Sequence, residues 1–489
     1  MSILFVIPPN KLNQGFSQCR PLGVFYLIAA LRKQGIKADV LDLERNVFTE
    51  KEIIGRVSEA GPKIIGLTAT SHTRFGALHL AEFFKTNFPE KHIIAGGPHF
   101  SQCAHDTLVH TDALDVVVRG EAEEIVCDLI PALLEGEDLG QIKGISFRKN
   151  GAICHNPDAA PPMNLDDLPI LTDFDHKDYS DKLLVYTENG KSIPAISIIT
   201  SRGCPYQCIF CSVKNSGYRV RSAKSVVDEI EMWIEKHPEI KAFNFFDLTF
   251  TVNAEHARSI CDEIVSRNLN ITWWAESRLN IDLSLLDVMK KAGCKAVSVG
   301  VESGSPRILK VIKKNINLDS LNDFAKRCDN LGIQVSFFFM LSHPTETMED
   351  LQKTKQMAQT LLASFRCVSD TSAGVTTILP GTELERISRD KGILPSDFSW
   401  SLPYCRPENL RASYSEYLPI YLETIPLKRL VKFREEIGAL GNIKRKNSSW
   451  QLLKWGFRRI FSSDRSVRYK LRVGLHTMKV WLGQHNSLQ

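Results

Sequence analysis

The sequence predicts an α/β protein with a Rossmann-like, doubly wound parallel sheet first, then a partial (βα)6 barrel and a small helical C-terminal region. Two series of alternation predict the two sheets. Short apolar runs alternate with helical patterns from residue 1 to about 130, and a second such series runs over residues 196–364. Strands separated by helices of this length are typical of parallel sheets.

The first series begins with the apolar run ILFVIPP and continues with a helical pattern that Gly35 closes. Four more runs read as strands: KADVLDLE, KIIGLTAT, HIIAGGP and ALDVVVRGE. Small or turn-forming residues end these strands, namely Pro8, Pro9, Thr70, Ser71, Gly96, Gly97 and Gly120. Ligands of open α/β sheets bind beyond the carboxyl ends of the strands, where glycine admits a close backbone approach. We therefore predict a large flat or phosphate-bearing ligand; glycines that only make tight turns are the alternative.

A hairpin pattern around Asn150 and a proline- and aspartate-rich stretch separate the two series. The second series predicts helices at about 225–236, 254–267, 284–292, 319–331 and 347–362. We accordingly divide the chain into a first domain, a hairpin with a linker, a barrel and a C-terminal helical region, at residues 1–135, 136–195, 196–395 and 396–489.

Composition restricts the setting of the protein. The 489 residues carry a formal net charge of +5, which is mild for this length, and we expect no nucleic-acid partner. No apolar run reaches the roughly 18 residues that span a bilayer, and no secretory signal precedes the first strand, so we expect a cytoplasmic protein. Disulfides are rare in that compartment, and clustered cysteines there more often bind metal or do redox work.

The C-terminal tail is strongly basic. From Asn442 onward, eleven Lys or Arg residues stand against the single acid Asp464, interleaved with apolar residues such as Trp450, Trp455 and Phe457. Two readings follow: helices that pack on the protein with a solvated basic face, or an element that lies on an anionic membrane surface.

Three of the twelve cysteines, Cys204, Cys208 and Cys211, lie within the segment RGCPYQCIFC, just after the first strand of the second series. A structural zinc site needs four protein ligands, and no further pair of ligands lies nearby in the sequence. Three thiolates instead suit a four-iron cluster with one iron left open. Half a zinc site and a chance occurrence are the alternatives. Phe210 precedes the last cysteine, where its ring can cover the cluster.

This C-x-x-x-C-aromatic-x-C segment resembles that of the radical S-adenosylmethionine (SAM) enzymes, which carry it after the first strand of a (βα)6 barrel. Later blocks resemble the same family in order, namely FFDLTFT, AESRLN, MKKAGCKAVSVGVESGS, KVIKKNIN, LGIQVSFFFML and LPGTELE. Residues 1–130 resemble the cobalamin-binding domain found in some members, through PLGVFYLIAALRKQGIKADVLD, GGPHFS and VRGEAEE. The resemblance covers about two-thirds of the chain and does not identify a substrate.

The resemblance implies that Cys204, Cys208 and Cys211 hold a [4Fe-4S] cluster whose open iron binds SAM, and that SAM cleavage yields a radical that abstracts a substrate hydrogen. It also implies an electron donor such as flavodoxin or ferredoxin. The residues expected to contact SAM are Phe210, Asn244, Asp247, Arg278 and Glu302. Those expected at cobalamin are Pro9, Ser71, His72, Gly96, Gly97, Gly120 and Glu121.

Two features depart from the family pattern. The usual GxPGET block is LSHPTET here, so Ser342 and Thr345 replace glycines and His343 enters. His343 either packs in a loop or donates and accepts a proton. The first domain also lacks the D-x-H-x-x-G motif that supplies a histidine to cobalt in other B12 proteins, as do many members of the resembled family.

The resemblance favours a methyltransferase that methylates an unactivated carbon of a biosynthetic substrate, with cobalamin carrying the methyl group and no catalytic side chain assigned. One alternative is an enzyme of the same architecture that catalyses a non-methylating cyclisation, elimination or oxidation. A second is a non-catalytic cofactor-binding protein, which the three clustered thiols disfavour. The substrate is a small molecule or, given the basic tail, a membrane-derived lipid.

Overall fold

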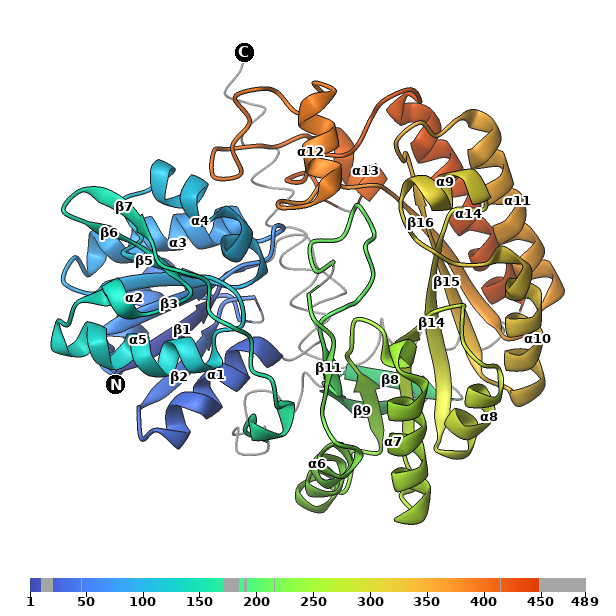
Figure 1. Ribbon diagram of the computed structural model, residues 1–489, viewed down its shortest axis with the longest axis horizontal. Helices are drawn as coiled ribbons and strands as arrows, with labels where there is room; N and C mark the ends of the chain where they lie inside the picture. The colour runs from blue at the N-terminus through green and yellow to red at the C-terminus, as the bar shows by residue number, and fades with distance from the viewer. Residues whose placement is uncertain are drawn as a thin grey trace.

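The computed structural model describes residues 1–9, 21–44, 46–170, 184–188, 191–214, 216–413 and 415–447. Figure 1 shows two lobes, each built on one large sheet, with the segment that carries α12 (Glu383–Asp390) and α13 (Leu410–Ser413) above them. The predicted fold class is confirmed for both lobes.

The first lobe is a seven-stranded sheet in the order β2-β1-β3-β4-β5-β6-β7, whose first five strands are parallel. One apolar core joins α1 and α5 to one face, and a second joins α2, α3 and α4 to the other, as in a doubly wound fold. The elements are β1 (Ile3–Ile7), α1 (Leu22–Lys33), β2 (Ala38–Asp42), α2 (Glu50–Ala60), β3 (Ile64–Thr68), α3 (Arg74–Asn87), β4 (His92–Gly96), α4 (Pro98–His110), β5 (Val116–Val118) and α5 (Glu123–Glu135).

The predicted hairpin is present and belongs to the first sheet. Its strands are β6 (Ile145–Lys149) and β7 (Ala152–His155), and β6 pairs antiparallel with β5. Asn150 and Gly151 turn the chain with φ of 52° and 81°, the left-handed backbone that a two-residue hairpin requires. The hairpin therefore covers the β5 edge of the parallel sheet.

The second lobe contains six parallel strands that neighbour one another in chain order, with an antiparallel β8 on the β9 edge. This open arc confirms the partial (βα)6 barrel. The strands are β8 (Leu184–Glu188), β9 (Lys191–Ile198), β12 (Ala242–Phe245), β13 (Thr272–Ser277), β14 (Cys294–Glu302), β15 (Gln334–Leu341) and β16 (Val368–Val375). The helices are α6 (Ala223–Lys236), α7 (Ala254–Ser266), α8 (Ser284–Lys291), α9 (Pro306–Val311), α10 (Leu321–Leu331), α11 (Met348–Ser364) and α14 (Leu427–Asn447).

Alternation along these strands separates an outer face from an inner one. Val297, Val299 and Val301 of β14 lie in the core under the helices, so Ser298 and Glu302 lie on the other face. The same parity and the strand register place a polar and aromatic set on this inner face: Ser197, Asn244, Trp274, Glu276, Ser298, Glu302, Ser336 and Phe338. The inner face of the arc therefore carries polar and aromatic side chains that can contact a ligand, whereas the outer face packs against the helices.

The C-terminal region holds the two lobes together. Arg74, at the start of α3, is completely buried and donates hydrogen bonds to the carbonyls of Trp400 at 3.0 Å and Tyr417 at 2.6 Å. Asp106 of α4 accepts from the hydroxyls of Ser399 and Ser401 at 3.0 and 2.8 Å. Residues 399–401 and Tyr417 are therefore fastened to the first lobe although they follow the barrel in the chain.

Of the basic tail, only residues 442–447 are described, as the end of α14, and residues 448–489 lie outside the described residues. Within the part of the chain that the structure covers, every helix is too short or too polar to traverse a bilayer.

Candidate active site

The three clustered cysteines lie in a loop that a short antiparallel ladder closes. β10 (Ser201–Arg202) pairs with β11 (Arg219–Val220), and the loop between them follows β9. Inside the loop, Ser216 accepts at its Oγ from the Cys204 amide at 3.0 Å and donates its own amide to the Cys204 carbonyl at 3.1 Å. Gly203 has φ of 81°, and a Cβ there would lie 2.0 Å from the Gly217 carbonyl oxygen, so the loop cannot close with any other residue.

The chemistry of these thiols fits an iron–sulfur cluster. All three are free, with Cys208 buried and Cys204 and Cys211 half-buried. Burial raises the pKa of Cys208, while the charges of Lys314 and Arg278 oppose that rise. Burial also raises the pKa of Cys211, and the nearby Cys204 and Cys208 raise it further. Cys208 and Cys211 are therefore held as neutral thiols, and a positively charged cluster bound between them would stabilise their thiolate forms.

Among the described residues, no three His, Cys, Asp or Glu side chains converge on the position of a single metal ion. Each thiolate of a four-iron cluster binds a different iron, so its three cysteines need not converge on a point. The arrangement is therefore compatible with a four-iron cluster.

Asp247 was predicted to contact SAM. In the structure, its carboxylate accepts hydrogen bonds from other residues of the protein. It is buried beyond the end of β12, and its two oxygens accept four hydrogen bonds from the amides and hydroxyls of Thr200 and Ser201. Burial raises the pKa of Asp247 above its ordinary value, and these hydrogen bonds oppose part of that rise. Asp247 thus orders the two residues that lead into the cysteine loop.

Arg278 contacts the cysteine loop, and Asn244 lies on the inner face of the arc. The Arg278 guanidinium lies 3.5 Å above the ring of Tyr206, which belongs to the cysteine loop, and it donates to the carbonyls of Lys314 and Asn315 at 2.5 and 3.1 Å. Asn244 donates to the Ser197 hydroxyl at 3.4 Å. Arg278 therefore joins the cysteine loop to residues 313–315.

Glu302 lies at the carboxyl end of β14 with φ of 69° and accepts from Lys314 Nζ at 2.7 Å. Its neighbour on the inner face, Glu276, has its pKa raised chiefly by desolvation and further by the charge of Glu302. Lys314 had no predicted role, although it belongs to the block KVIKKNIN. It counters the negative charge of this face and lies beside the cysteine loop, where the Lys313 carbonyl accepts a weak bond from Cys208 Sγ at 3.9 Å.

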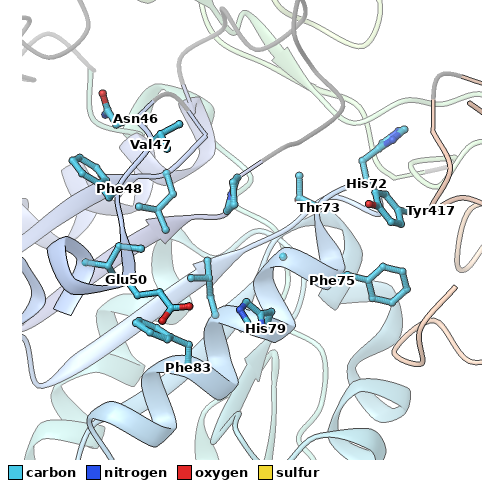
Figure 2. Close-up of a pocket in the computed structure, with 15 residues that line it drawn as sticks. Asn46, Val47, Phe48, Glu50, His72, Thr73, Phe75, His79, Phe83 and Tyr417 are labelled. Carbon is cyan, nitrogen blue, oxygen red and sulfur yellow. The ribbon is translucent and has the colours of Figure 1, made fainter. Parts of the chain in front are cut away.

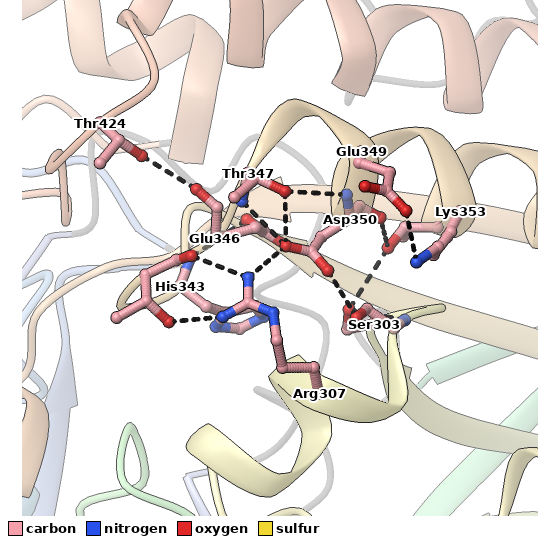
Figure 3. Close-up of polar contacts among 12 residues, drawn as sticks. Ser303, Arg307, His343, Glu346, Thr347, Glu349, Asp350, Lys353 and Thr424 are labelled. Carbon is pink, nitrogen blue, oxygen red and sulfur yellow. Dashed lines mark hydrogen bonds and ion pairs between the residues drawn. The ribbon is translucent and has the colours of Figure 1, made fainter.

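Polar contacts that involve Arg307, Glu346 and Asp350 surround the LSHPTET loop (Figure 3). The backbone of this loop is left-handed at both positions where the resembled pattern has glycine. Ser342 has φ of 71° and Thr345 has φ of 62°. The Glu346 carboxylate accepts from the amides of Ser342 at 2.5 Å and His343 at 3.1 Å, and Arg307 donates to the Thr345 hydroxyl at 2.9 Å. Hydrogen bonds therefore hold a turn that glycine would adopt freely.

His343 is buried beneath the cysteine loop, with its ring centroid 6.5 Å from that of Phe210. Burial lowers the pKa of His343 to about 4 and raises that of Glu346 to about 7. The imidazole is therefore neutral at physiological pH, and the predicted packing role describes its surroundings better than proton exchange with solvent does.

At the edge of the first lobe, the predicted glycines differ in their surroundings. A Cβ on Gly97 would clash with Thr68 Oγ1 at 2.6 Å, so the protein itself fills that space, whereas a Cβ on Gly96 would make an ordinary contact of 3.5 Å with the Val118 carbonyl. Gly120 has φ of 82° and nothing within 4 Å of such a Cβ. Of these glycines, Gly120 presents its backbone to open space, as a flat ligand requires.

Pro9 and His72 line a cavity of about 520 Å³ beside the carboxyl ends of β1, β2 and β3 (Figure 2). Phe48, Phe75 and Phe83 supply much of its wall, and Tyr417 reaches it from the C-terminal region. Ser71 lies apart from this lining and bonds the buried His99 ring at 3.1 Å between Oγ and Nδ1. Glu121 is paired with arginines of the second lobe.

Comparisons with known proteins match one family to each lobe. Residues 198–358 match the radical SAM superfamily, and residues 16–130 match the B12 binding domain. An uncharacterized methyltransferase of Pyrococcus horikoshii is 31% identical over 78% of this chain and 82% of its own length. The hopanoid C-3 methylase of Methylococcus capsulatus is 25% identical, and the alignment covers 78% of this chain and 71% of that protein. An anaerobic magnesium-protoporphyrin IX monomethyl ester cyclase of Rubrivivax gelatinosus is 28% identical over 73% and 66% of the two chains.

Solved structures share the fold. The radical SAM methyltransferase TsrM of Kitasatospora setae, solved with cobalamin and a [4Fe-4S] cluster, gives a TM-score of 0.64 at 21% identity, over 86% of this chain and 81% of that one. The cobalamin-dependent enzyme OxsB gives 0.68 at 18% identity, over 98% and 71%. With the 31% identical relative, these matches establish that the chain belongs to the radical SAM enzymes that carry a B12-binding domain.

Proposed function

We propose that this protein is a cobalamin-dependent radical SAM methyltransferase that acts on an unactivated carbon of a small biosynthetic substrate. The observation that supports this most is the contact between the carboxyl end of β5, in the B12-binding lobe, and Arg202, at the entry to the cysteine loop. The predicted cobalamin edge and the predicted cluster loop are thereby neighbours, as a transfer between two cofactors and one substrate requires.

When bound, the cluster would reduce SAM to start radical chemistry, and cobalamin would carry the methyl group. The chain's own residues would bind and orient. Cys204, Cys208 and Cys211 would hold the cluster, and Phe210 would shield it from water. Glu302, kept in place by Lys314, would offer a carboxylate at the inner face.

The inner face would receive the substrate. Phe338 of β15 is 36% exposed there, and Trp274 of β13 lies on the same face. Such aromatic side chains favour an apolar or ring-bearing substrate over a strongly charged one. The residue roles and the domain boundaries stay predictions.

Anaerobic reconstitution tests the proposal. The wild-type protein should take up about four iron, four sulfide and one cobalamin per chain, and replacing the three cysteines by alanine should abolish the iron and SAM cleavage while leaving cobalamin in place. With a low-potential chemical reductant present and SAM labelled in its methyl group, the label should be recovered on the bound cobalamin before any substrate is added. Iron retained by the triple variant would place the cluster elsewhere.

The second candidate is a non-methylating radical reaction, which the likeness to the cyclase of Rubrivivax gelatinosus favours. In that case SAM would be cleaved reductively and no label would reach cobalamin.

We also propose a cytoplasmic enzyme that receives electrons from a flavodoxin or ferredoxin, with the tail after residue 441 as a membrane-surface contact that would suit a lipid substrate. Anionic vesicles should sediment the full-length protein at low salt and not the protein truncated at Gly441, because screening shortens the reach of surface charge. Full-length protein that stays in the supernatant would exclude the membrane contact.

A further inference from the structure

Two arginines face each other in the β10–β11 ladder, which closes the cysteine loop and which we call the neck of that loop. In the β10–β11 ladder, Arg202 is the direct cross-strand partner of Arg219. Both side chains are largely buried, at 13% and 8% exposed. Like charges directly opposite one another destabilise an antiparallel pair, and burial strengthens their repulsion because little water screens it. The ladder that closes the loop therefore needs a counter-charge.

The counter-charge comes from the other lobe. Glu121 accepts from Arg202 Nη1 at 2.9 Å and from Arg219 Nη1 at 3.2 Å, and it also pairs with Arg219 Nη2. Glu123 accepts from Arg202 Nη2 at 2.6 Å. Two carboxylates thus neutralise two guanidiniums. Among the described residues, Glu121 is the carboxylate that Arg219 pairs with, whereas Arg202 has both.

The first lobe and the linker that follows it also contact the two arginines. The Arg202 guanidinium lies 5.0 Å from the ring centroid of Tyr26, on α1, and Arg219 donates to the Pro162 carbonyl at 2.6 Å. Gly120, the residue before Glu121, is the glycine whose backbone faces open space at the predicted cobalamin edge. Gly120 therefore faces the predicted cobalamin edge, and the next residue, Glu121, faces the cysteine loop.

We propose that Glu121 is a positioning residue for the iron–sulfur site: its carboxylate, from the B12-binding lobe, closes the neck of the cysteine loop in the other lobe by neutralising the Arg202–Arg219 pair. The inference rests on the proposed function in that the loop holds the cluster. The cysteine loop is thus complete only when the two lobes are docked. Retention of the cluster then depends on a residue that binds no iron.

The test uses the full-length protein in two states. Without iron, amide hydrogen exchange over residues 203–218 reports the neck directly. In Glu121→Gln, we expect protection there to fall about tenfold, because Arg219 is left unpaired opposite Arg202. Glu124→Gln is the matched control, since Glu124 is exposed in the first turn of α5, three residues after Glu121. The conservative Glu121→Asp should recover part of the protection.

Removing the charge of Arg219 distinguishes repulsion between the two arginines from the simple loss of a contact with Glu121. Arg219→Gln leaves Glu121 paired with Arg202, so we expect it to lower protection by less than Glu121→Gln does. The double variant should match Arg219→Gln alone, because the repelling pair is gone. After anaerobic reconstitution, iron loss to a chelator should accelerate in the same order, with Glu121→Gln fastest. The far-ultraviolet spectrum and thermal unfolding verify that each variant is folded.

Protection in Glu121→Gln that equals protection in Glu124→Gln would overturn the proposal. Additive losses in the double variant would also overturn it, because they would mean that repulsion between the arginines is not the cause. If the wild type bound no cluster, the proposed function would fail on its own, and the exchange measurement would still decide whether Glu121 closes the neck.

Discussion

Thr200 donates both its backbone amide and its hydroxyl to the carboxylate of Asp247, with an N–Oδ1 distance of 2.7 Å and an Oγ1–Oδ2 distance of 2.5 Å. Ser201 adds a second pair of bonds to the same oxygens at 3.1 and 2.9 Å. The strand end of β12 thus controls the backbone just before the cysteine loop.

Removing this carboxylate should disturb the loop. Asp247→Ala leaves four buried donors without an acceptor, so we expect it to lower the free energy of unfolding by about 2–4 kcal/mol and to speed iron loss after reconstitution. Asp247→Asn should do less, because one carbonyl oxygen remains. Denaturant unfolding measures the first effect, with the exposed Asp262→Asn as the control. A change in SAM affinity at unchanged stability would instead support the predicted contact with SAM.

The raised pKa of Glu346 predicts a pH dependence. Its pKa lies at about 7 in the folded protein against an ordinary 4.5, because burial disfavours the charged form. Between pH 4.5 and 7 the folded state holds a proton that the unfolded state has released, so stability falls as pH rises. The difference in stability between the wild type and Glu346→Gln should therefore shift by on the order of 3 kcal/mol in favour of the variant from pH 4.5 to pH 8.

Unfolding of the apo protein and the variant across this pH range measures that shift. Groups common to both proteins, His343 included, cancel in the difference. A constant difference between the two proteins would mean that the pKa of Glu346 is not raised in the folded state.

The left-handed turn in LSHPTET predicts opposite outcomes at its two positions. Thr345 is exposed and β-branched at φ of 62°, so Thr345→Gly should relieve strain and stabilise the protein by about 1 kcal/mol, even without the bond from Arg307. Ser342 donates from its Oγ to the buried Tyr421 carbonyl at 2.5 Å, and Ser342→Gly leaves that acceptor without this donor. We expect Ser342→Gly to be neutral or destabilising. Thermal unfolding should rank Thr345→Gly above the wild type, and the reverse order of the two variants would refute this account.

Gly120 offers a test of the cobalamin edge. Gly120→Ala should lower cobalamin retention at least several-fold, because its Cβ would project into the open space beyond β5. Gly136→Ala is the matched control, since Gly136 also has positive φ, at 71°, and open surroundings, at the far end of α5. Equal cobalamin content in the two variants, measured from the absorbance of the bound cofactor, would remove Gly120 from the site. Gly97 is unsuited to this test because a side chain there would clash with Thr68 inside the domain.

Much of the fold could be predicted because it depends on local patterns. The expected helix at 254–267 is α7, Ala254–Ser266, and the Asn253 side chain caps its start. The expected helix start at 319 is replaced by a 3-10 turn over Leu318–Ser320, so α10 begins at Leu321. The hairpin pattern at Asn150 was evident, whereas the sheet that it joins depends on pairing with β5, which no local pattern encodes.

The site was less predictable because its contacts span long stretches of chain. Asp247 and Glu302 stand out as acids at strand ends, yet the partners that occupy them, Thr200 and Lys314, follow only from the folded register. The pairing of Glu121 with Arg202 joins residues 81 positions apart. Glu121 lies in VRGEAEE and Arg202 lies in the cysteine segment, and both segments resemble family segments. The sequence therefore indicated that both residues have a function, but it did not indicate that they contact each other.

The antiparallel strands at the sheet edges bear on how this enzyme can be recombined with its relatives. β7 ends at His155 and seals the first sheet, β8 begins at Leu184 and seals the second, and Asp166 already accepts from the Ser222 amide of the barrel lobe at 2.9 Å. A chimera joined at residue 135 would strip the first sheet of its hairpin and leave β5 as a bare edge, open to pairing with other chains. Asn156, Pro157, Asp158 and Ala159 still contact the first lobe, so a junction at residues 160–161 lets each sheet keep its own border.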